Sequence, residues 1–205
     1  GQACLFDVET EKFIDVLQPI ELSTKQTNYV TRIYSLEKGI AWILCENGYA
    51  FRVDEQLCKK GEGITLYAPS NHNLKGNQIF NIYQDSEEDE WILTDKGVSI
   101  IGKKTLDTDF PFQFITQIKE SIYLIAENDK LARYDFHTKK LKFVDIPYPH
   151  DKINNVTTIG KDMLALGTDN GLILYSIPQN SFQQIDIRTA TQTSNFVESV
   201  YQDCQ

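Results

Sequence analysis

The sequence predicts an all-β fold of repeated four-stranded antiparallel sheets, and three observations predict it. Alternation of apolar and polar residues at period two dominates, whereas the 3.6-residue period of amphipathic helices is almost absent. An apolar run, a short polar turn and a second apolar run recur, most clearly in LALGTDNGLILY at 164–175. These recurrences lie 33 to 49 residues apart, a spacing that suits four short strands each. Repeats of this kind are typical of the blades of a β-propeller.

The hairpin at 164–175 is the clearest copy of the repeat. Asn170-Gly171 between two apolar runs predicts a type I′ turn, in which both central residues have positive φ. Related hairpins begin at Trp42, Trp91 and Leu124, with the sequences WILCENGYAFRVD, WILTDKGVSII and LIAENDKLARYD. Each hairpin is expected to form the second and third strands of a blade.

The order of elements follows from these repeats. Two short strands joined at Glu9-Thr10 open the chain and match the second half of the fourth repeat, so the chain starts within a repeat. A polar loop is expected at 18–28, and a long loop-rich segment at 55–77. We expect one β-propeller segment over 1–205, a fragment of a larger propeller. It would have four complete four-stranded blades and partial terminal blades. The repeats are expected at 1–17 (partial), 28–60, 78–108, 114–146, 153–187 and 196–205 (partial).

Alignment of the repeats on their turns gives two sets of equivalent positions. The first set is Trp42, Trp91, Leu124 and Ala165, and the second is Ile33, Ile82, Ile118 and Ile159. At the end of the chain FVESVYQD restates IFNIYQD, which makes it a first strand with Val200 at the position of Ile82. Trp42 and Trp91 are expected to fill the layer between neighbouring blades, because stacked sheets bury their apolar faces against one another.

Composition and charge argue against several classes of function. The chain has 205 residues and a net charge of −9, which argues against nucleic acid as a partner. No run approaches the ~20 apolar residues that span a bilayer, and no signal peptide is seen. The four cysteines (Cys4, Cys45, Cys58 and Cys204) lack metal-ligand spacing, so we expect free thiols and no metal site.

No catalytic constellation or cofactor motif is recognisable. Recurring aspartates at 85, 95, 135, 169 and 203 suggest carboxylate chemistry, but Asp also caps β-turns through its own side chain, and we favour that interpretation. The three histidines lie in turns or loops without a nucleophile partner. We therefore expect no enzyme, no catalytic residues and no cofactor.

Two surface features are candidates for binding. Lysines near the third-to-fourth strand turns (59, 60, 103, 104, 139, 140 and 142) could form a basic crescent for an anionic glycan, although edge lysines also prevent pairing between sheets. The loops between blades lie on the same face as the hairpin turns, and binding residues concentrate on such loops. The loop residues best suited to stack on sugar rings or to bond their hydroxyls are Tyr67, Asn71, His72, Tyr148 and His150.

The segments ALGTDNGLILYS and IYQDSEEDEWILTDKGV resemble the two-component regulator propeller repeat, whose pattern runs Ile-x-x-Asp and then Trp-Ile-Gly-Thr-x-x-Gly-Leu. The resemblance extends over nearly the whole chain. It departs where Leu124 and Ala165 stand in place of Trp and where Lys130 stands in place of the turn Gly. Such repeats form the periplasmic sensor regions of Bacteroides-type hybrid histidine kinase/response regulators, which commonly respond to glycan-derived oligosaccharides. No kinase or spanning segment is present, so the resemblance implies part of such a sensor or a truncated relative.

The resemblance implies a periplasmic sensing module with an oligosaccharide ligand. It would be attached to the membrane only through other parts of the full protein, and its open edges would be covered by the remainder of the sensor propeller or by a second chain. An alternative is a protein-interaction scaffold without a small-molecule ligand, which a stable protein partner in place of a glycan would favour. A third reading is a propeller glycosidase or lyase, which predicts turnover that a single Asp or Glu change abolishes.

Overall fold

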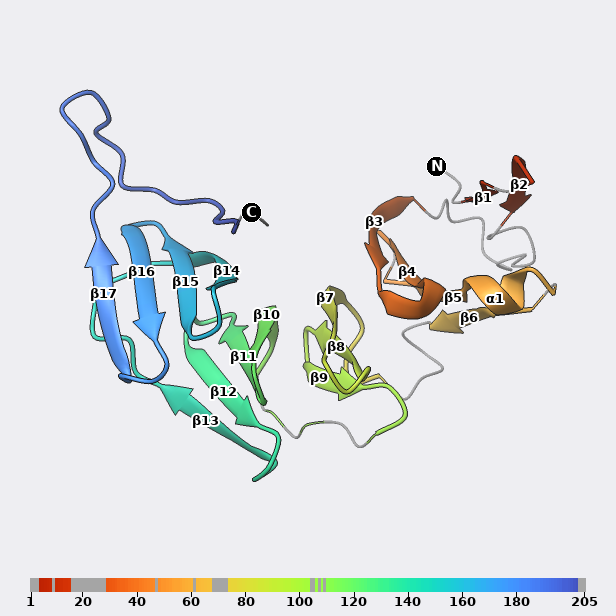
Figure 1. Ribbon diagram of the computed structural model, residues 1–205, viewed down its shortest axis with the longest axis horizontal. Helices are drawn as coiled ribbons and strands as arrows, with labels where there is room; N and C mark the ends of the chain where they lie inside the picture. Colours follow the sequence, from red (N-terminus) through yellow and green to blue (C-terminus); the bar gives the residue numbers. More distant parts are fainter. Residues whose placement is uncertain are drawn as a thin grey trace. The chain divides into compact units, whose positions relative to one another are not determined.

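The computed structural model describes residues 4–8, 10–15, 29–46, 48–60, 62–67, 74–103, 106, 108 and 110–202. The chain forms two compact units, Gly1–Asp107 and Thr108–Gln205, and each is considered by itself. Both units consist of antiparallel sheets in which consecutive strands are neighbours (Figure 1). This all-β architecture agrees with the prediction. The prediction of one propeller segment spans both units and stays a prediction.

The first unit begins with a two-stranded sheet, followed by a complete blade. The hairpin of β1 (Cys4–Asp7) and β2 (Lys12–Asp15) confirms the two predicted opening strands. The first blade comprises β3 (Val30–Ser35), β4 (Ile40–Cys45), β5 (Ala50–Asp54) and β6 (Ile64–Tyr67). The short helices η1 (Glu37–Gly39) and α1 (Glu55–Cys58) lie between its strands. Asp54 caps α1 by accepting the Leu57 N–H, and this inserted helix moves the fourth strand beyond residue 60, where the repeat was expected to end.

The second blade has three strands in the described part of the chain, whereas four were expected. They are β7 (Ile79–Gln84), β8 (Glu90–Thr94) and β9 (Gly97–Ile100). The fourth strand is represented there by one isolated bridge between Val98 and Leu106.

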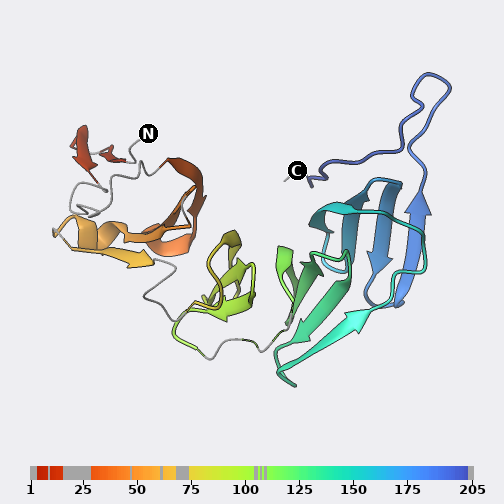
Figure 2. The same cartoon turned by 180° about the vertical axis from the view of Figure 1, so that it is seen from behind.

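The second unit contains two complete blades, which Figure 2 shows from behind. The third blade comprises β10 (Phe112–Ile118), β11 (Ser121–Ala126), β12 (Leu131–Asp135) and β13 (Lys140–Val144). The fourth comprises β14 (Ile153–Ile159), β15 (Met163–Thr168), β16 (Gly171–Ser176) and β17 (Ser181–Ile185). Hairpin turns and interblade loops lie at the same end of each sheet, because each strand reverses the direction of the one before it.

The register of the sheets corrects the sequence alignment in the third and fourth repeats. The first strand of every blade carries a bulge one residue from its start, which provides a common origin. From this origin Tyr123, not Leu124, is equivalent to the tryptophans, and the first-strand markers are Ile115 and Val156, not Ile118 and Ile159. The alignment of the third repeat failed because Lys130 was placed at the turn glycine, whereas Asp129, with a φ of +59°, holds the position of Gly48, with a φ of +81°. The Gly48 N–H donates to the Cys45 carbonyl, and the Asp129 N–H donates to the Ala126 carbonyl in the same way.

In each unit, neighbouring blades pack through the same arrangement of apolar side chains. Trp42 and Leu44, on one face of β4, pack against Ile82 and Ile92 of the second blade, so Trp42 lies in the interblade layer as predicted. Trp91 is likewise buried. In the second unit Tyr123 and Ile125 contact Val156 and Leu166 in the same manner. This pattern confirms that period-two alternation assigns one face of each sheet to its neighbour.

Polar groups within this layer differ between the two units. The Trp42 indole N–H donates to Glu90 at 2.6 Å, and Arg52 also binds this buried carboxylate, with Nη2 2.6 Å from Oε1. In the fourth blade Leu164 occupies the register position of Glu90. The Tyr123 hydroxyl has no hydrogen-bond partner among the described residues.

The hairpin at 168–171 differs from the expected type I′ turn. Gly171 has a φ of +95°, whereas neither Asp169 nor Asn170 has a positive φ. The Thr168 hydroxyl accepts the Asn170 N–H and donates to the Gly171 carbonyl, at 3.1 and 2.8 Å. Thr94 makes the same pair of contacts in the second blade. The threonine hydroxyl therefore shapes these turns, and glycine follows the turn rather than forming its centre.

Residues 186–202 form no strand, although a first strand was expected from residue 196. The segment returns past β15 and β14 in both views (Figures 1 and 2). The Val197 N–H donates to the Thr168 carbonyl, and the Val200 N–H donates to Asn155 Oδ1. Gln202 accepts the Gly160 N–H at 2.8 Å, just as Gln84 of β7 accepts the Glu37 N–H in the first unit.

The equivalence of the Gln202 and Gln84 contacts places residues 197–202 at the position of a first strand. A ladder also needs a second strand, and the described residues supply none beside this segment.

Candidate functional site

The strongest candidate site is a groove along β13 in the second unit. Two hollows of about 390 and 450 Å³ adjoin at Phe143, Val144 and Asp145. We call this the β13 groove, and its lining residues are Asn128, Asp129, Lys130, Leu131, Phe143, Val144, Asp145, Ile146, Pro147, His150, Asn180 and Phe182. Most of them come from the β11–β12 turn and from the loop between the third and fourth blades. The groove therefore includes the loop and turn face on which binding residues were expected.

Local hydrogen bonds hold the interblade loop against the β11–β12 turn. Asp129 has a φ of +59°, a conformation that Asp tolerates better than most residues, and its carboxylate accepts the Ile153 N–H at 2.7 Å. His150 lies with Nδ1 2.8 Å from the Tyr148 carbonyl and Nε2 3.3 Å from the Asp129 carbonyl. The imidazole thus bridges the loop and the turn, so this wall of the groove is preformed.

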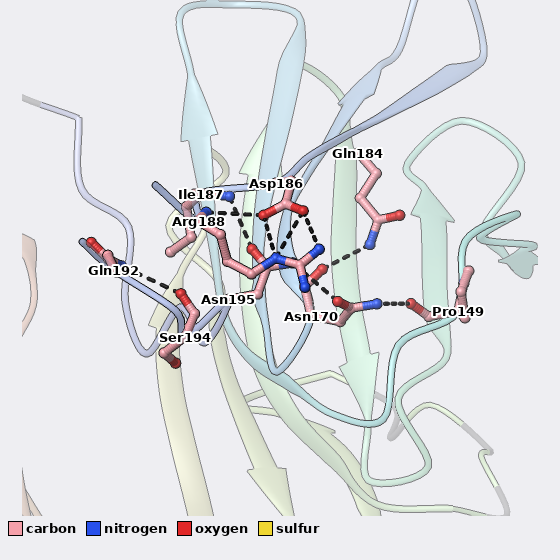
Figure 3. A network of polar contacts seen from close by, with 9 residues as sticks. All are labelled: Pro149, Asn170, Gln184, Asp186, Ile187, Arg188, Gln192, Ser194 and Asn195. Carbon is pink, nitrogen blue, oxygen red and sulfur yellow. Dashed lines mark hydrogen bonds and ion pairs between the residues drawn. The ribbon is translucent and has the colours of Figure 1, made fainter. Parts of the chain in front are cut away.

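Further contacts attach the same loop to the fourth blade. The Tyr148 hydroxyl donates to the Phe182 carbonyl at 3.2 Å, and its ring packs against the apolar core of the unit. The Asn170 side chain donates to the Pro149 carbonyl at 3.4 Å (Figure 3). Both sides of the loop are therefore fixed.

The polar network in Figure 3 continues from Asn170 to the segment after β17. Asn170 accepts from Asn195 through its side chain and from Gln184 through its carbonyl, at 3.0 and 2.7 Å. Asp186 and Arg188 form an exposed, bidentate ion pair, and the hydrogen bonds from Arg188 lower the pKa of Asp186 to about 2. The network fixes the start of the 186–202 segment on the β15–β16 turn.

Phe143 lies at the edge of the groove, with its side chain on the face of β13 opposite to that of Val144. Its ring is 44% exposed, although it belongs to a strand. The Phe110 ring supports it at a centroid distance of 5.4 Å, and Lys130 Nζ lies 6.0 Å from its centroid. An exposed aromatic face with polar side chains around it can accept an apolar ring face while the polar groups bind that ring's edge.

The residues predicted from the sequence lie in different surroundings. His150 lines the groove, and Tyr148 anchors the loop that forms its wall. Tyr67 instead packs on Trp42 at a centroid distance of 4.8 Å, and burial raises the pKa of its hydroxyl. Asn71 and His72 lie outside the described residues. Involvement of these five residues in ligand binding stays a prediction.

Sequence reasoning missed Phe143, Asp145 and Asn180, which come from a strand, a strand end and a turn. The available signal was Phe143 itself, an aromatic that follows the exposed lysines of an outer strand. A search restricted to loops could not find it.

The remaining candidates have structural partners. Asp85 and Asp135 accept backbone N–H groups of their own turns, which confirms the turn-capping interpretation for these two. Asp95 instead accepts the N–H groups of Asn77 and Gln78, and Asp169 accepts from the Asn154 side chain. Asp203 lies outside the described residues. Lys59 pairs with Glu55, and Lys103 with Asp89.

Within the described part of the chain, no three His, Cys, Asp or Glu side chains are grouped to hold a metal ion. Cys45 and Cys58 are free and buried, and burial raises the pKa of both thiols.

A third hollow, of about 300 Å³, lies in the first unit, where the first and second blades meet. It is lined by the β4–β5 turn and by the starts of β3 and β7. Arg32 reaches across it to the Phe80 carbonyl at 3.4 Å. The guanidinium therefore bridges the two blades.

The fold is shared with extracellular domains of two proteins from Bacteroides thetaiotaomicron. The extracellular domain of BT4673 from Bacteroides thetaiotaomicron, assigned to a hybrid two-component system, superposes with a TM-score of 0.66 at 18% identity, over 88% of this chain and 26% of that one. The corresponding domain of BT3049 from the same organism gives 0.61 at 14% identity, over 84% and 26%. The chain thus spans about a quarter of the length of these domains.

The same fold also occurs in an enzyme. Virginiamycin B lyase from Staphylococcus aureus superposes with a TM-score of 0.58 at 14% identity, over 77% of this chain and 55% of the lyase. At such identities the likeness establishes the β-propeller fold and no particular activity. The sequence matches no protein-family model and no curated protein. In the described residues no helix is long and apolar enough to cross a membrane.

Proposed function

We propose that this chain is an extracytoplasmic ligand-binding module of a hybrid two-component signalling system and that its ligand is a glycan-derived oligosaccharide. The observation that carries the proposal is the fold shared with the BT4673 and BT3049 extracellular domains over more than four fifths of the chain. The repeat sequence ALGTDNGLILYS and the preformed β13 groove support it. By the same reasoning the module would be periplasmic, and the rest of the full protein would attach it to the inner membrane.

Calorimetry with the purified chain and a panel of oligosaccharides tests the proposal. We expect saturable binding of at least one oligosaccharide, together with loss of signalling when residues 108–202 are deleted from the full sensor in a reporter strain. Absence of binding across the panel, with a reporter indifferent to the deletion, would contradict it.

Binding without turnover is part of the proposal. The recurring aspartates Asp85, Asp95 and Asp135 hold turns and loops, which supports a structural role for them. Prolonged incubation with each bound oligosaccharide should return it intact by mass spectrometry. Cleavage that a single Asp or Glu substitution abolishes would instead establish a glycosidase or lyase.

An alternative is a scaffold whose blades present a surface to another protein. The observation that favours it is Tyr201, which is 85% exposed on the segment at the first-strand position. The equivalent Tyr34 and Tyr83 lie opposite Trp42 and Trp91 and are half-buried. A strand supplied by the remainder of the sensor propeller or by a second chain would cover Tyr201. A stable protein partner in a pull-down, without any glycan ligand, would support the scaffold.

A further inference from the structure

We propose that the hollow between the first and second blades binds a carboxylate-bearing sugar unit, a uronate, and that Arg32 selects it. We call this space, formed by the β4–β5 turn and the starts of β3 and β7, the Arg32 hollow. The inference rests on the proposed function and adds a location and a charge for the oligosaccharide.

The register of the first blade places the Arg32 side chain between the two blades. Arg32 pairs with Leu44 across β3 and β4, so both side chains lie on the same face of the sheet. Leu44 packs against Ile82 and Ile92, which identifies that face as the one that meets the second blade. Ile79 of β7 packs in the same cluster and lines the hollow from the opposite side.

Arg32 pairs with no carboxylate among the described residues. The other three arginines of the chain each form an ion pair, namely Arg52–Glu90, Arg133–Asp135 and Arg188–Asp186. Arg32 donates only through Nη1, to the Tyr34 hydroxyl at 3.3 Å and to the Phe80 carbonyl at 3.4 Å. Both are long contacts to neutral oxygens. Nε and Nη2 have no partner in the described part of the chain, so they offer two parallel donors, the pattern that fits a carboxylate.

The size of the hollow and its second charged residue favour a uronate over a small inorganic anion. A volume of about 300 Å³ is at the lower end for ligand pockets, so it suits a single sugar unit. Glu46 also lines the hollow and forms no ion pair with Arg32. A uronate carries its carboxylate at one end and hydroxyls around the ring. It can therefore bind Arg32 through the carboxylate and donate hydroxyl protons to Glu46, whereas sulfate or phosphate has no such neutral side.

Calorimetry of the purified chain with oligogalacturonates and oligoglucuronates, each compared with its methyl ester, tests the inference. The ester keeps the sugar rings and removes the charge, so the acid should bind about five- to tenfold more tightly. Because Arg32 is exposed, this preference should shrink as salt is raised from about 50 mM to about 1 M. Arg32→Gln should reduce the affinity of the acid to that of its ester. Arg32→Lys should keep only part of the preference, because an ammonium lacks the planar fork.

Arg188→Gln is the matched control. It removes the same charge from an exposed arginine of the second unit, so it should keep the full preference for the acid. Circular dichroism should show that Arg32→Gln is folded. Equal affinities for acids and esters, or a preference that both Arg32 variants leave intact, would overturn this inference and leave the proposed function standing. Absence of binding across acids, esters and neutral oligosaccharides would overturn both.

Discussion

At the scale of single residues, the interblade layers of the two units share the same apolar packing but differ in their buried polar groups. In the first unit Glu90 accepts from the Trp42 indole and pairs with Arg52, so each buried polar group has a partner. In the second unit Leu164 replaces that carboxylate, and the Tyr123 hydroxyl is buried without a partner among the described residues. A buried unpaired hydroxyl costs about 1–3 kcal/mol.

Tyr123→Phe should therefore raise the free energy of unfolding, by about 1 kcal/mol. The substitution removes the unpaired hydroxyl and keeps the ring that packs against Val156 and Leu166. Urea denaturation of both chains measures the difference. A loss of stability would show that the hydroxyl has a partner.

The same tyrosine predicts a loss of stability at alkaline pH. Burial raises the pKa of Tyr123 to about 12, whereas an unfolded tyrosine titrates near 10. Above pH 10 the unfolded chain releases this proton before the folded chain does, so stability falls as pH rises from 10 to 12. The shift corresponds to at most about 2.7 kcal/mol. Tyr123→Phe serves as the reference that removes the contribution of other alkaline titrations, and equal slopes for the two chains would contradict the assignment.

Trp91 provides a separate test of the blade packing. It is buried, and Asp85 accepts its indole N–H at 2.7 Å. Trp91→Ala should leave a cavity and cost about 3–5 kcal/mol. Chemical denaturation measures this, and an unchanged midpoint would mean that Trp91 is not part of an apolar layer.

At the scale of elements, turns determine how much could be predicted. Strand alternation predicted β1, β2 and the four hairpins, because period-two burial is a local property of the sequence. The one-residue offset at Tyr123 was missed because Asp129, which is not a glycine, has the positive φ of this turn, so alignment on a turn glycine placed Lys130 there instead. The Thr168 contacts that shape the turn were also missed, because Asn-Gly is a stronger turn signal than threonine. Phe143 was also not selected from the sequence, because its exposure depends on which residues pack beside β13.

Gly171→Ala tests the turn. A Cβ there would lie 2.5 Å from the Ile185 carbonyl oxygen, at a φ of +95°. Gly160→Ala is the matched control, with a φ of +58° and no atom within 4 Å of the added carbon. Gly171→Ala should be less stable than Gly160→Ala by about 1–3 kcal/mol in urea denaturation, because a backbone clash adds to the strain of positive φ. Equal stabilities would show that the turn can rearrange.

At the scale of the whole molecule, residues 197–202 are the most informative segment. Gln202 makes the contact that Gln84 makes from a first strand, yet the segment carries the exposed Tyr201. Unpaired strand edges pair readily with other chains. We expect four blades and two partial ones to form an open arc whose edges another chain covers, rather than a closed five-bladed ring.

Sedimentation velocity over a range of concentrations tests this expectation, with self-association predicted at high concentration. Gly167→Val provides the critical comparison. A Cβ at Gly167 would lie 3.0 Å from both Val197 Cγ1 and the Val197 carbonyl oxygen, so the larger side chain should displace the segment. Because valine favours strands, β15 itself should persist. Displacement removes the ordered edge, so the variant should associate more weakly than the unchanged chain. A strictly monomeric particle whose scattering fits a closed five-bladed ring would refute the open arc, and association that Gly167→Val leaves unchanged would exclude residues 197–202 as the edge that pairs.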